Sequence, residues 1–430
     1  MLLVVVVVVV PVSAAQGEIR VATTGNIFFS TQYLLQSDST VAELHDVEKI
    51  IVSIIDTYTN AGFPFCRVVP STHDAQTDTT VLLSIEEGER VVVSDYVFES
   101  NGKTRTNSIR KIAHVTPGDY FSSSDIAQTK ENVLKTDAFI AVDEKIVRRG
   151  DRYYVLLHLT EKNSDFLQAS GSFDDENALF NVSFYSLNLL GTLRRFQFRY
   201  EYEKLFSLQF TEPILLYPAV LDANFSLWTY DSIRLTQFHA TFAAPLWRFF
   251  AFKMLTGVES VSSLDSDSAS HGHTDNIIGV GLGVDYETPN LEGHHQFAYD
   301  YLFRTHDRWR IQLDLENTVY RLDAEIHYVR AQTDSFEFFD YYRLGGARSL
   351  RGYREDQFFA TRAFWVNCAY KAIFVFPILD MAVINSTFLY SYGIGVYAES
   401  QLADVSLVLA WPKGGSWQDG KIHLLFEKGF

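Results

Sequence analysis

Histidines and carboxylates are the side chains best suited to chemistry in this chain, but their spacing does not assemble a catalytic set. Glu86 and Glu87 stand beside Gly88, yet no nucleophile occurs with a base and an orienting group at a recognisable spacing. The histidines considered for such a set are His239, His294, His295 and His327. The sequence therefore predicts neither an enzyme nor a bound cofactor.

An acidic, histidine-containing stretch is the best candidate for a metal site. Imidazole nitrogens and carboxylate oxygens are both ligands of divalent cations. A segment this polar is more often a solvated outer loop than a metal site, so we predict no bound metal. The residues concerned are Asp265, Asp267, His271, His273 and Asp275.

A glycine-flanked arginine is the strongest candidate for a specific role. It lies in the segment LGGARSLRGYRED, Leu344 to Asp356. Because arginine presents five donors in a planar fork and stays charged, Arg351 could tether this loop to a polar partner. The alternative is a surface loop with a solvated arginine. The candidate residues of the loop are Gly345, Gly346, Leu350, Arg351, Gly352 and Tyr353.

The segment from Asp165 to Phe430 alternates apolar and polar residues with period two, which predicts β-strands. In LRRFQFRYEYE, Leu193 to Glu203, aromatic residues alternate with charged or polar ones. A polar lumen with an apolar outer band predicts a transmembrane antiparallel β-barrel. About sixteen strands fit between the turn signals, each near the roughly 9 to 11 residues that a bilayer requires. A soluble sandwich is the alternative, but charges on the polar face of strand after strand argue against it.

One predicted strand carries glycines on the side assigned to the lumen. Gly279, Gly281 and Gly283 alternate with outward residues that include Ile278 and Val280. Glycines at these positions leave room for something folded inside the barrel. The other residues assigned to the inner wall are Asp314, Glu325, Asn367 and Asn385.

Loop lengths give the predicted barrel a direction. If the first strand begins at Asp165 on the periplasmic side, the short connections LLGT, EPILLYP, APLW, TPNLEG and FPI fall on that side. The longer DSDSASHGHTD and WPKGGSWQDG segments then fall outside, together with the Arg351 loop. Short periplasmic turns and long outer loops are typical of bacterial barrels.

Residues 16–162 follow a mixed pattern that occurs twice. The first copy has a strand over 18–24, a helix over 41–60 that ends before Gly62, and two strands joined by a polar turn at 73–78. The second copy has a strand over 91–101, helices over 106–115 and 124–138, and a hairpin over 140–162. This repeat predicts two small α+β domains, 16–91 and 92–162, followed by the barrel over 163–430. The exposed edge of such a sheet can accept an extended client segment as an added strand.

The first 15 residues are interpreted as a signal peptide. Their apolar run, LLVVVVVVVPV, is too short to span a bilayer and precedes the small residues Ser13, Ala14 and Ala15, although the usual positive N-terminal residues are missing. A buried core strand is the alternative.

The net charge of −17, from 36 Lys and Arg against 53 Asp and Glu, argues against nucleic acid as a partner. The two cysteines, Cys66 and Cys368, fall in different predicted domains and are interpreted as unpaired.

The chain resembles the superfamily of outer-membrane assembly and secretion barrels, of the BamA/TamA-like surface antigen type. Its N-terminal repeats are similar to polypeptide-transport-associated (POTRA) domains in AGFPFCRV at 61–68, IEEGERVVVSDYVFESN at 85–101 and TPGDYFSSSDI at 116–126. The other matching motifs are the NLLGT turn at 188–192, Leu350-Arg351-Gly352-Tyr353 after two glycines, and the terminal KIHLLFEKGF. The resemblance covers nearly the whole mature chain.

The resemblance implies that Arg351 enters the lumen on a sixth outer loop and is pinned to the inner wall near the strands that follow it. Ala369 and Asn385 occupy positions where the family often shows acidic residues. We therefore expect Arg351 to use amide, carbonyl or aromatic contacts, or inward carboxylates such as Glu325 and Asp314. The last residues resemble the signal by which bacterial barrels are recognised for insertion. The residues of this signal are Ile422, Leu424, Phe426 and Phe430.

The function implied by the resemblance is the insertion, assembly or translocation of client polypeptides. The expected location is the bacterial outer membrane, with the N-terminal domains in the periplasm. The expected partners are unfolded outer-membrane or secreted polypeptides, outer-membrane lipid and, through the POTRA-like domains, a periplasmic or inner-membrane protein. One alternative is a two-partner-secretion-type transporter of a single exoprotein, which the two repeats favour although no plug helix or Pro-rich linker is seen. The other alternative is a passive channel.

Overall fold

The chain divides into two compact units, Met1–Lys162 and Asn163–Phe430. The computed structural model describes residues 19–35, 40–41, 44–74, 79–173, 178–230, 232–247, 249–264, 272–288, 291–305, 307–347, 349–371, 374–398 and 404–429. The signal-peptide prediction for residues 1–15, the cation-site candidates Asp265, Asp267 and His271, and the terminal Phe430 all lie outside these residues. No helix in the described ranges is long and apolar enough to cross a membrane.

The first repeat of the N-terminal unit is a four-stranded sheet with two helices. Its elements are β1 (Ile19–Thr24), α1 (Thr31–Leu35), β2 (Thr40–Val41), α2 (Leu44–Asn60), β3 (Arg67–Asp74) and β4 (Thr79–Glu86), with sheet order β2-β1-β4-β3. The apolar face of α2 buries Val47, Ile54 and Tyr58 in the same cluster as Leu83 of β4. This burial explains the predicted helical periodicity. The sequence pattern did not predict α1 or β2, because 5 and 2 residues are too few to show a period.

The second repeat follows directly and has the predicted order of elements. They are β5 (Val93–Ser100), α3 (Thr106–Ile112), α4 (Ser123–Leu134), β6 (Phe139–Arg149) and β7 (Arg152–Glu161), with sheet order β5-β7-β6. Ser122 caps α4, because its hydroxyl accepts a hydrogen bond from the backbone N–H of Asp125 at 3.2 Å. Val133 of α4 and Leu157 of β7 are fully buried.

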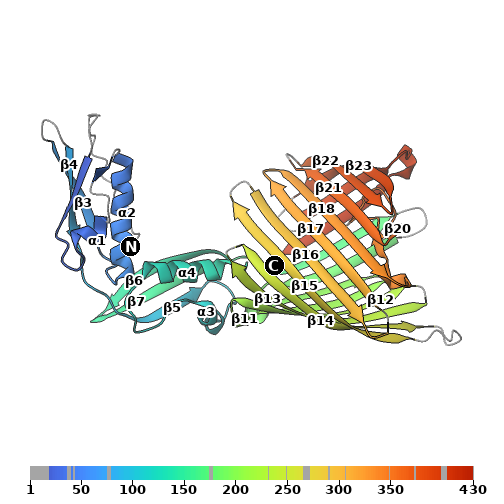
Figure 1. Cartoon of the computed structure of the whole chain (residues 1–430), viewed down its shortest axis with the longest axis horizontal. Helices are drawn as coiled ribbons and strands as arrows, with labels where there is room; N and C mark the ends of the chain where they lie inside the picture. Colours follow the sequence, from blue (N-terminus) through green and yellow to red (C-terminus); the bar gives the residue numbers. More distant parts are fainter. Residues whose placement is uncertain are drawn as a thin grey trace. The chain divides into compact units, whose positions relative to one another are not determined.

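The C-terminal unit is a single antiparallel sheet of sixteen strands within the described residues (Figure 1). The sheet closes because β25 pairs with β8, from Ile422 opposite Phe173 to Gly429 opposite Phe166. The strands are β8 (Asp165–Phe173), β9 (Ala178–Ser186), β10 (Arg195–Glu201), β11 (Leu205–Leu216), β12 (Ala219–Tyr230), β13 (Ile233–Trp247), β14 (Phe250–Ser263), β15 (His273–Thr288), β16 (Leu291–Phe303), β17 (Arg308–Val319), β18 (Leu322–Thr333), β21 (Arg362–Tyr370), β22 (Val375–Ile384), β23 (Thr387–Ala398), β24 (Asp404–Pro412) and β25 (Lys421–Gly429).

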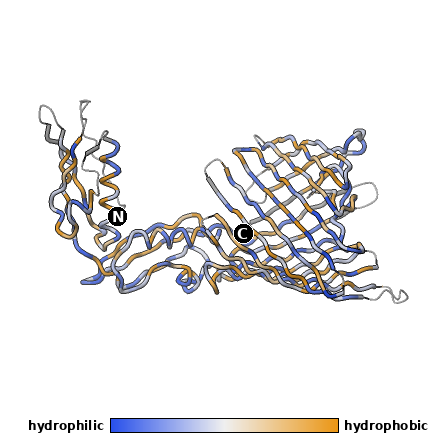
Figure 2. The backbone as a smooth tube through the Cα atoms, in the orientation of Figure 1, coloured by the Kyte–Doolittle hydropathy of each residue, from blue (hydrophilic) through white to orange (hydrophobic). Residues whose placement is uncertain are grey.

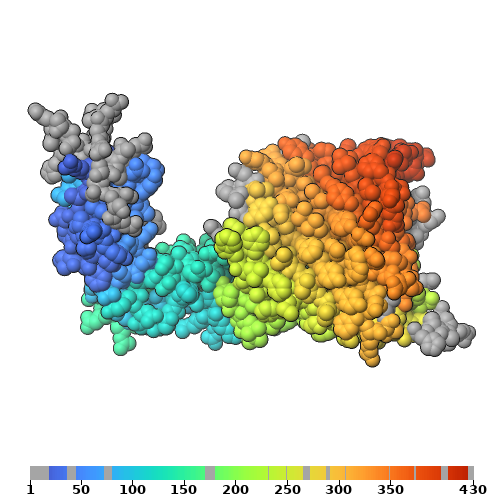
Figure 3. All heavy atoms as spheres, viewed as in Figure 1, coloured from blue at the N-terminus to red at the C-terminus, as the bar shows by residue number. Residues whose placement is uncertain are grey.

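The wall of the barrel has an apolar outer face, as the alternation predicts. On β15, Ile278, Val280 and Leu282 are 52%, 47% and 46% exposed on the outside. Orange and blue segments alternate along the strands in Figure 2, and the atoms of the wall form a continuous surface on the face seen in Figure 3. The strands range from 7 residues in β10 to 16 in β15, so many are longer or shorter than the predicted 9 to 11. The predicted fold is nevertheless confirmed.

Candidate functional site

The glycine-flanked arginine lies in the long connection between β18 and β21. We call this connection, residues 334–361, loop 6. It contains the short helix η2 (Phe338–Asp340) and a small hairpin of β19 (Tyr342–Leu344) and β20 (Phe358–Ala360). Leu344, Leu350 and Tyr353 of the loop pack in one buried cluster with Ala363 of β21 and Ala382 of β22. Apolar packing therefore holds the loop against the inner wall.

Arg351 is bound to one carboxylate of that wall, Asp380 on β22. Its backbone N–H and Nε each donate to Asp380 Oδ2 at 2.9 Å, and one terminal nitrogen donates to Oδ1 at 2.5 Å. A terminal nitrogen also donates to the carbonyl oxygen of Cys368 at 3.4 Å. Asp380 is fully buried, so its charge depends on this pairing. We call the Arg351–Asp380 pair the latch.

The latch corrects the expected partners of Arg351. The sequence interpretation found Ala369 and Asn385 at the family's acidic positions and turned to amide, carbonyl or aromatic contacts, or to carboxylates such as Glu325 and Asp314. The contact with the Cys368 carbonyl is of the expected kind, but the carboxylate partner is a different residue. The carboxylate is at residue 380, where it points inward among the apolar side chains of Val375–Ile384. An isolated charge within an apolar strand is a signal that could have identified it, because such a charge must be paired.

The other predicted wall residues serve the loop or one another. Asn367 lies on the inner wall and donates to the carbonyl oxygen of Ser349 in loop 6 at 2.6 Å. Asn385 does not line the lumen: it is an exposed turn residue with φ +46°, and it donates to Phe359 O at 3.0 Å. Glu325 and Asp314 both face His327, at 3.6 and 2.7 Å, within the wall.

The loop glycines are required by backbone shape and close approach. Gly345, Gly346 and Gly352 have φ values of +122°, +87° and +89°, a region that side-chain-bearing residues rarely adopt. A Cβ atom on Gly352 would lie 2.9 Å from the carbonyl carbon of Trp411 on β24. Glycine there lets the loop backbone lie directly on the wall beside the latch.

The glycines of β15 lie close to the neighbouring strands β14 and β16. The three atoms nearest to a Cβ at each of Gly279, Gly281 and Gly283 belong to neighbouring strands, and the Lys253 side chain covers the last two. Whether these glycines leave room for a segment inside the barrel stays a prediction.

The predicted insertion signal lies on the closing strand β25. Ile422 and Leu424 point outward and are exposed, whereas the intervening His423 points inward and is buried. The imidazole Nε2 of His423 accepts a hydrogen bond from the backbone N–H of Gly352 at 3.3 Å. The last strand is therefore in contact with loop 6. The backbone of Phe426 pairs with that of Val405 on β24.

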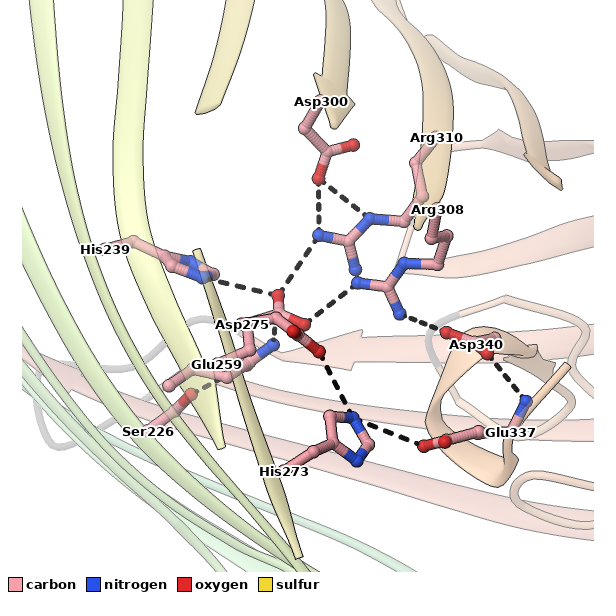
Figure 4. Close-up of polar contacts among 11 residues, drawn as sticks. Ser226, His239, Glu259, His273, Asp275, Asp300, Arg308, Arg310, Glu337 and Asp340 are labelled. Atoms are coloured by element: carbon pink, nitrogen blue, oxygen red, sulfur yellow. Dashed lines mark hydrogen bonds and ion pairs between the residues drawn. The ribbon is translucent and has the colours of Figure 1, made fainter. Parts of the chain in front are cut away.

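The sequence interpretation did not predict a cluster of buried charges on the inner wall. Arg308 on β17 contacts Glu259 on β14 at 2.9 Å and Asp340 in loop 6 at 2.5 Å (Figure 4). Near it, His273 contacts Asp275 at 3.3 Å and Glu337 of loop 6 at 3.5 Å. The described residues contain no group of three or more His, Cys, Asp and Glu side chains suited to a metal ion.

The N-terminal unit offers open sheet edges rather than a polar site. In the ranges that the structure describes, β6 pairs only with β7, and β3 pairs only with β4. Ile140 of β6 is 65% exposed. Burial and the nearby carboxylate of Glu87 raise the pKa of the Cys66 thiol to about 12, which makes this cysteine a poor nucleophile.

No protein-family model and no curated protein matches the sequence, but solved structures share its fold. A structure of BamA from Haemophilus ducreyi lacking POTRA domains 1–3 has a TM-score of 0.61 at 12% identity, over 96% of this chain and 99% of that one. CdiB from Escherichia coli has a TM-score of 0.61 at 11% identity, over 98% and 93%. CdiB from Acinetobacter baumannii has a TM-score of 0.59 at 11% identity, over 98% and 91%. The predicted resemblance is thus confirmed at the level of the fold.

Proposed function

We propose that this protein is an outer-membrane barrel that inserts or translocates client polypeptides, with its N-terminal unit in the periplasm. The observation that carries the proposal is the latch, in which Arg351 of loop 6 is bound to the buried Asp380 inside a closed barrel. A loop held against the inner wall by a buried ion pair supports a pathway that can be closed and opened. The shared fold with BamA and CdiB supports the same function.

Client capture is assigned to the open edges of the small sheets. An unfolded segment could pair with β6 or β3 through backbone hydrogen bonds, which do not depend on the client's side chains. The proposal contains no enzymatic step. Folding of the client after delivery would supply the driving force.

A second candidate function is the secretion of one dedicated exoprotein. The likeness to the two CdiB structures, over almost the whole chain, favours it as much as the likeness to BamA favours general assembly. We propose the general role first, and the depletion experiment separates it from dedicated secretion.

Depletion of the protein tests the proposal and separates the two candidates. We compare the outer-membrane proteome with the secreted proteome before and after depletion. Loss of many outer-membrane proteins supports general assembly, and loss of one secreted protein supports dedicated secretion. Unchanged proteomes would contradict both candidates.

A deletion of residues 18–162 distinguishes either candidate from a passive channel. A channel keeps its conductance and its physiological role without the N-terminal unit, whereas an assembly or secretion barrel loses client handling. Heat-modifiable migration in gels checks that the shortened barrel is still inserted.

A further inference from the structure

Loop 6 is bonded to the wall at a second place, far along the loop from Arg351. Arg308, the first residue of β17, is 3% exposed at its side chain, and its two terminal nitrogens face different carboxylates (Figure 4). One nitrogen donates to Asp340 Oδ1 at 2.5 Å and the other donates to Glu259 Oε2 at 2.9 Å. One guanidinium therefore joins a wall strand to the loop.

Asp340 uses its second oxygen to fix the loop itself. Asp340 Oδ2 accepts a hydrogen bond from the backbone N–H of Glu337 at 2.6 Å, which closes the turn of η2. The carboxylate is almost fully buried between the loop and the wall. Its position thus defines both the shape of the first half of loop 6 and its place on the wall.

Glu259, the wall carboxylate that binds Arg308, has further polar partners on the wall. Glu259 accepts a hydrogen bond from Gln237 Nε2 at 2.9 Å and lies 3.3 Å from a terminal nitrogen of Arg310. Arg310 is held in turn by Asp300 of β16. A buried charge is stable only when it is paired. Arg308 is therefore held in place by Glu259 of the wall, and its other terminal nitrogen is free to bind Asp340 of the loop.

Weaker contacts attach the same half of the loop to neighbouring strands. Glu337 lies 3.5 Å from His273 of β15, and the Phe338 ring lies 4.5 Å from the ring of Tyr230 on β12. The guanidinium of Arg343 lies 5.3 Å from the Tyr230 ring and 5.7 Å from the ring of Trp228. The first half of loop 6 therefore contacts the sector from β12 to β17, whereas the latch contacts β22.

We infer that loop 6 has two independent anchors, the latch and a second one formed by Arg308, Glu259 and Asp340, which we call the wall clamp. Release of one anchor leaves the other half of the loop on the wall, and release of both leaves the apolar packing and contacts such as that of Lys204 with Asp356, at 2.8 Å, which we expect not to retain it. Arg308 and Asp340 are thus positioning residues of the proposed pathway. The inference rests on the barrel of the proposed function but not on client handling, so each can fail without the other.

Conductance of the full-length protein in planar bilayers tests the inference. We compare Asp340→Asn, which weakens the wall clamp, with Asp380→Asn, which weakens the latch, and with the double variant. The matched control is Asp314→Asn, because the Asp314 carboxylate pairs with His327 inside the wall and belongs to neither anchor. We expect near-wild-type conductance for each single variant and the control, and a several-fold rise for the double variant.

Two results would overturn the inference. Conductance of either single variant equal to that of the double variant would show that the anchors are not independent. A double variant that inserts but conducts like the wild type would show that they do not retain the loop.

If the double variant does not insert into the membrane, trypsin cleavage of the single variants on intact cells tests the wall clamp instead. We expect cutting after Arg343 in Asp340→Asn but not in Asp380→Asn. Equal cutting at this position in both variants would refute the wall clamp.

Discussion

Replacing Asp380 by asparagine keeps the size of the side chain but removes the charge that holds Arg351. The carboxylate accepts hydrogen bonds from the backbone N–H, Nε and a terminal nitrogen of Arg351, at 2.9, 2.9 and 2.5 Å. Breaking a buried ion pair costs about 3–5 kcal/mol, and Arg351 borders the lumen, so we take about 3 kcal/mol for the latch. A loss of about 3 kcal/mol raises the released fraction of this part of the loop by roughly 100-fold.

Maleimide labelling of a buried reporter measures that release. Ala360, in β20 near the latch, is fully buried, so an Ala360→Cys variant lacking both natural cysteines reacts only when this half of loop 6 leaves the wall. Asp380→Asn should raise the labelling rate by roughly 100-fold. Glu325→Gln, which removes a wall carboxylate that contacts His327, should leave the rate unchanged. The reasoning is refuted if Glu325→Gln raises labelling and Asp380→Asn does not.

Three further predictions concern single residues. Gly352→Ala should release the latch half of the loop by about 1–3 kcal/mol, seen as faster labelling of the same reporter, because φ is +89° and Trp411 is too close for a Cβ. Alkylation of Cys66, with the other cysteine removed, should be slow at pH 8 and rise toward pH 12, because its raised pKa keeps the thiol protonated; a plateau by pH 9 would contradict this. Ile54→Ala should lower the stability of the first repeat by about 2–5 kcal/mol in calorimetry of the full chain, whereas the exposed Val52→Ala on the same helix should not; equal effects would refute the assigned core.

The barrel was predictable because its wall separates two solvents. Each strand repeats an apolar outer residue and a polar or small inner one, as Val280 and Gly281 do on β15. This period of two survives in the sequence whatever the register between strands. The longer helix α2 was predictable for a similar reason, since its buried face repeats over 17 residues.

The partner of Arg351 was missed for a reason that is local to β22. The expectation relied on where the family often has acidic residues, found Ala369 and Asn385 there, and turned to other contacts such as Glu325 and Asp314. The alternation of β22 itself places Asp380 inward, between Ile378 and Ala382, which are both buried. A carboxylate on that face has to find a cation, and loop 6 supplies Arg351.

The wall clamp could not be predicted from any local pattern. Arg308 and Asp340 are 32 residues apart, and the pairing of β14 to β17 in the sheet brings Glu259 beside them. Charged residues on the inner faces of neighbouring strands are common in the sequence, so composition does not single out these three. Their burial, rather than their type, distinguishes them.

The central claim is that the wall from β8 to β25 separates lipid from a polar lumen, and fluorescence quenching tests it most directly. A bimane probe is attached at Val280→Cys on the outer face of β15, or at Gln312→Cys on the inner face of β17, in a variant lacking both natural cysteines reconstituted into bilayers. Brominated lipid should quench the probe at position 280 and spare the one at 312, and a water-soluble quencher should do the reverse. Quenching of the 312 probe by lipid, with the 280 probe shielded from it, would contradict the account.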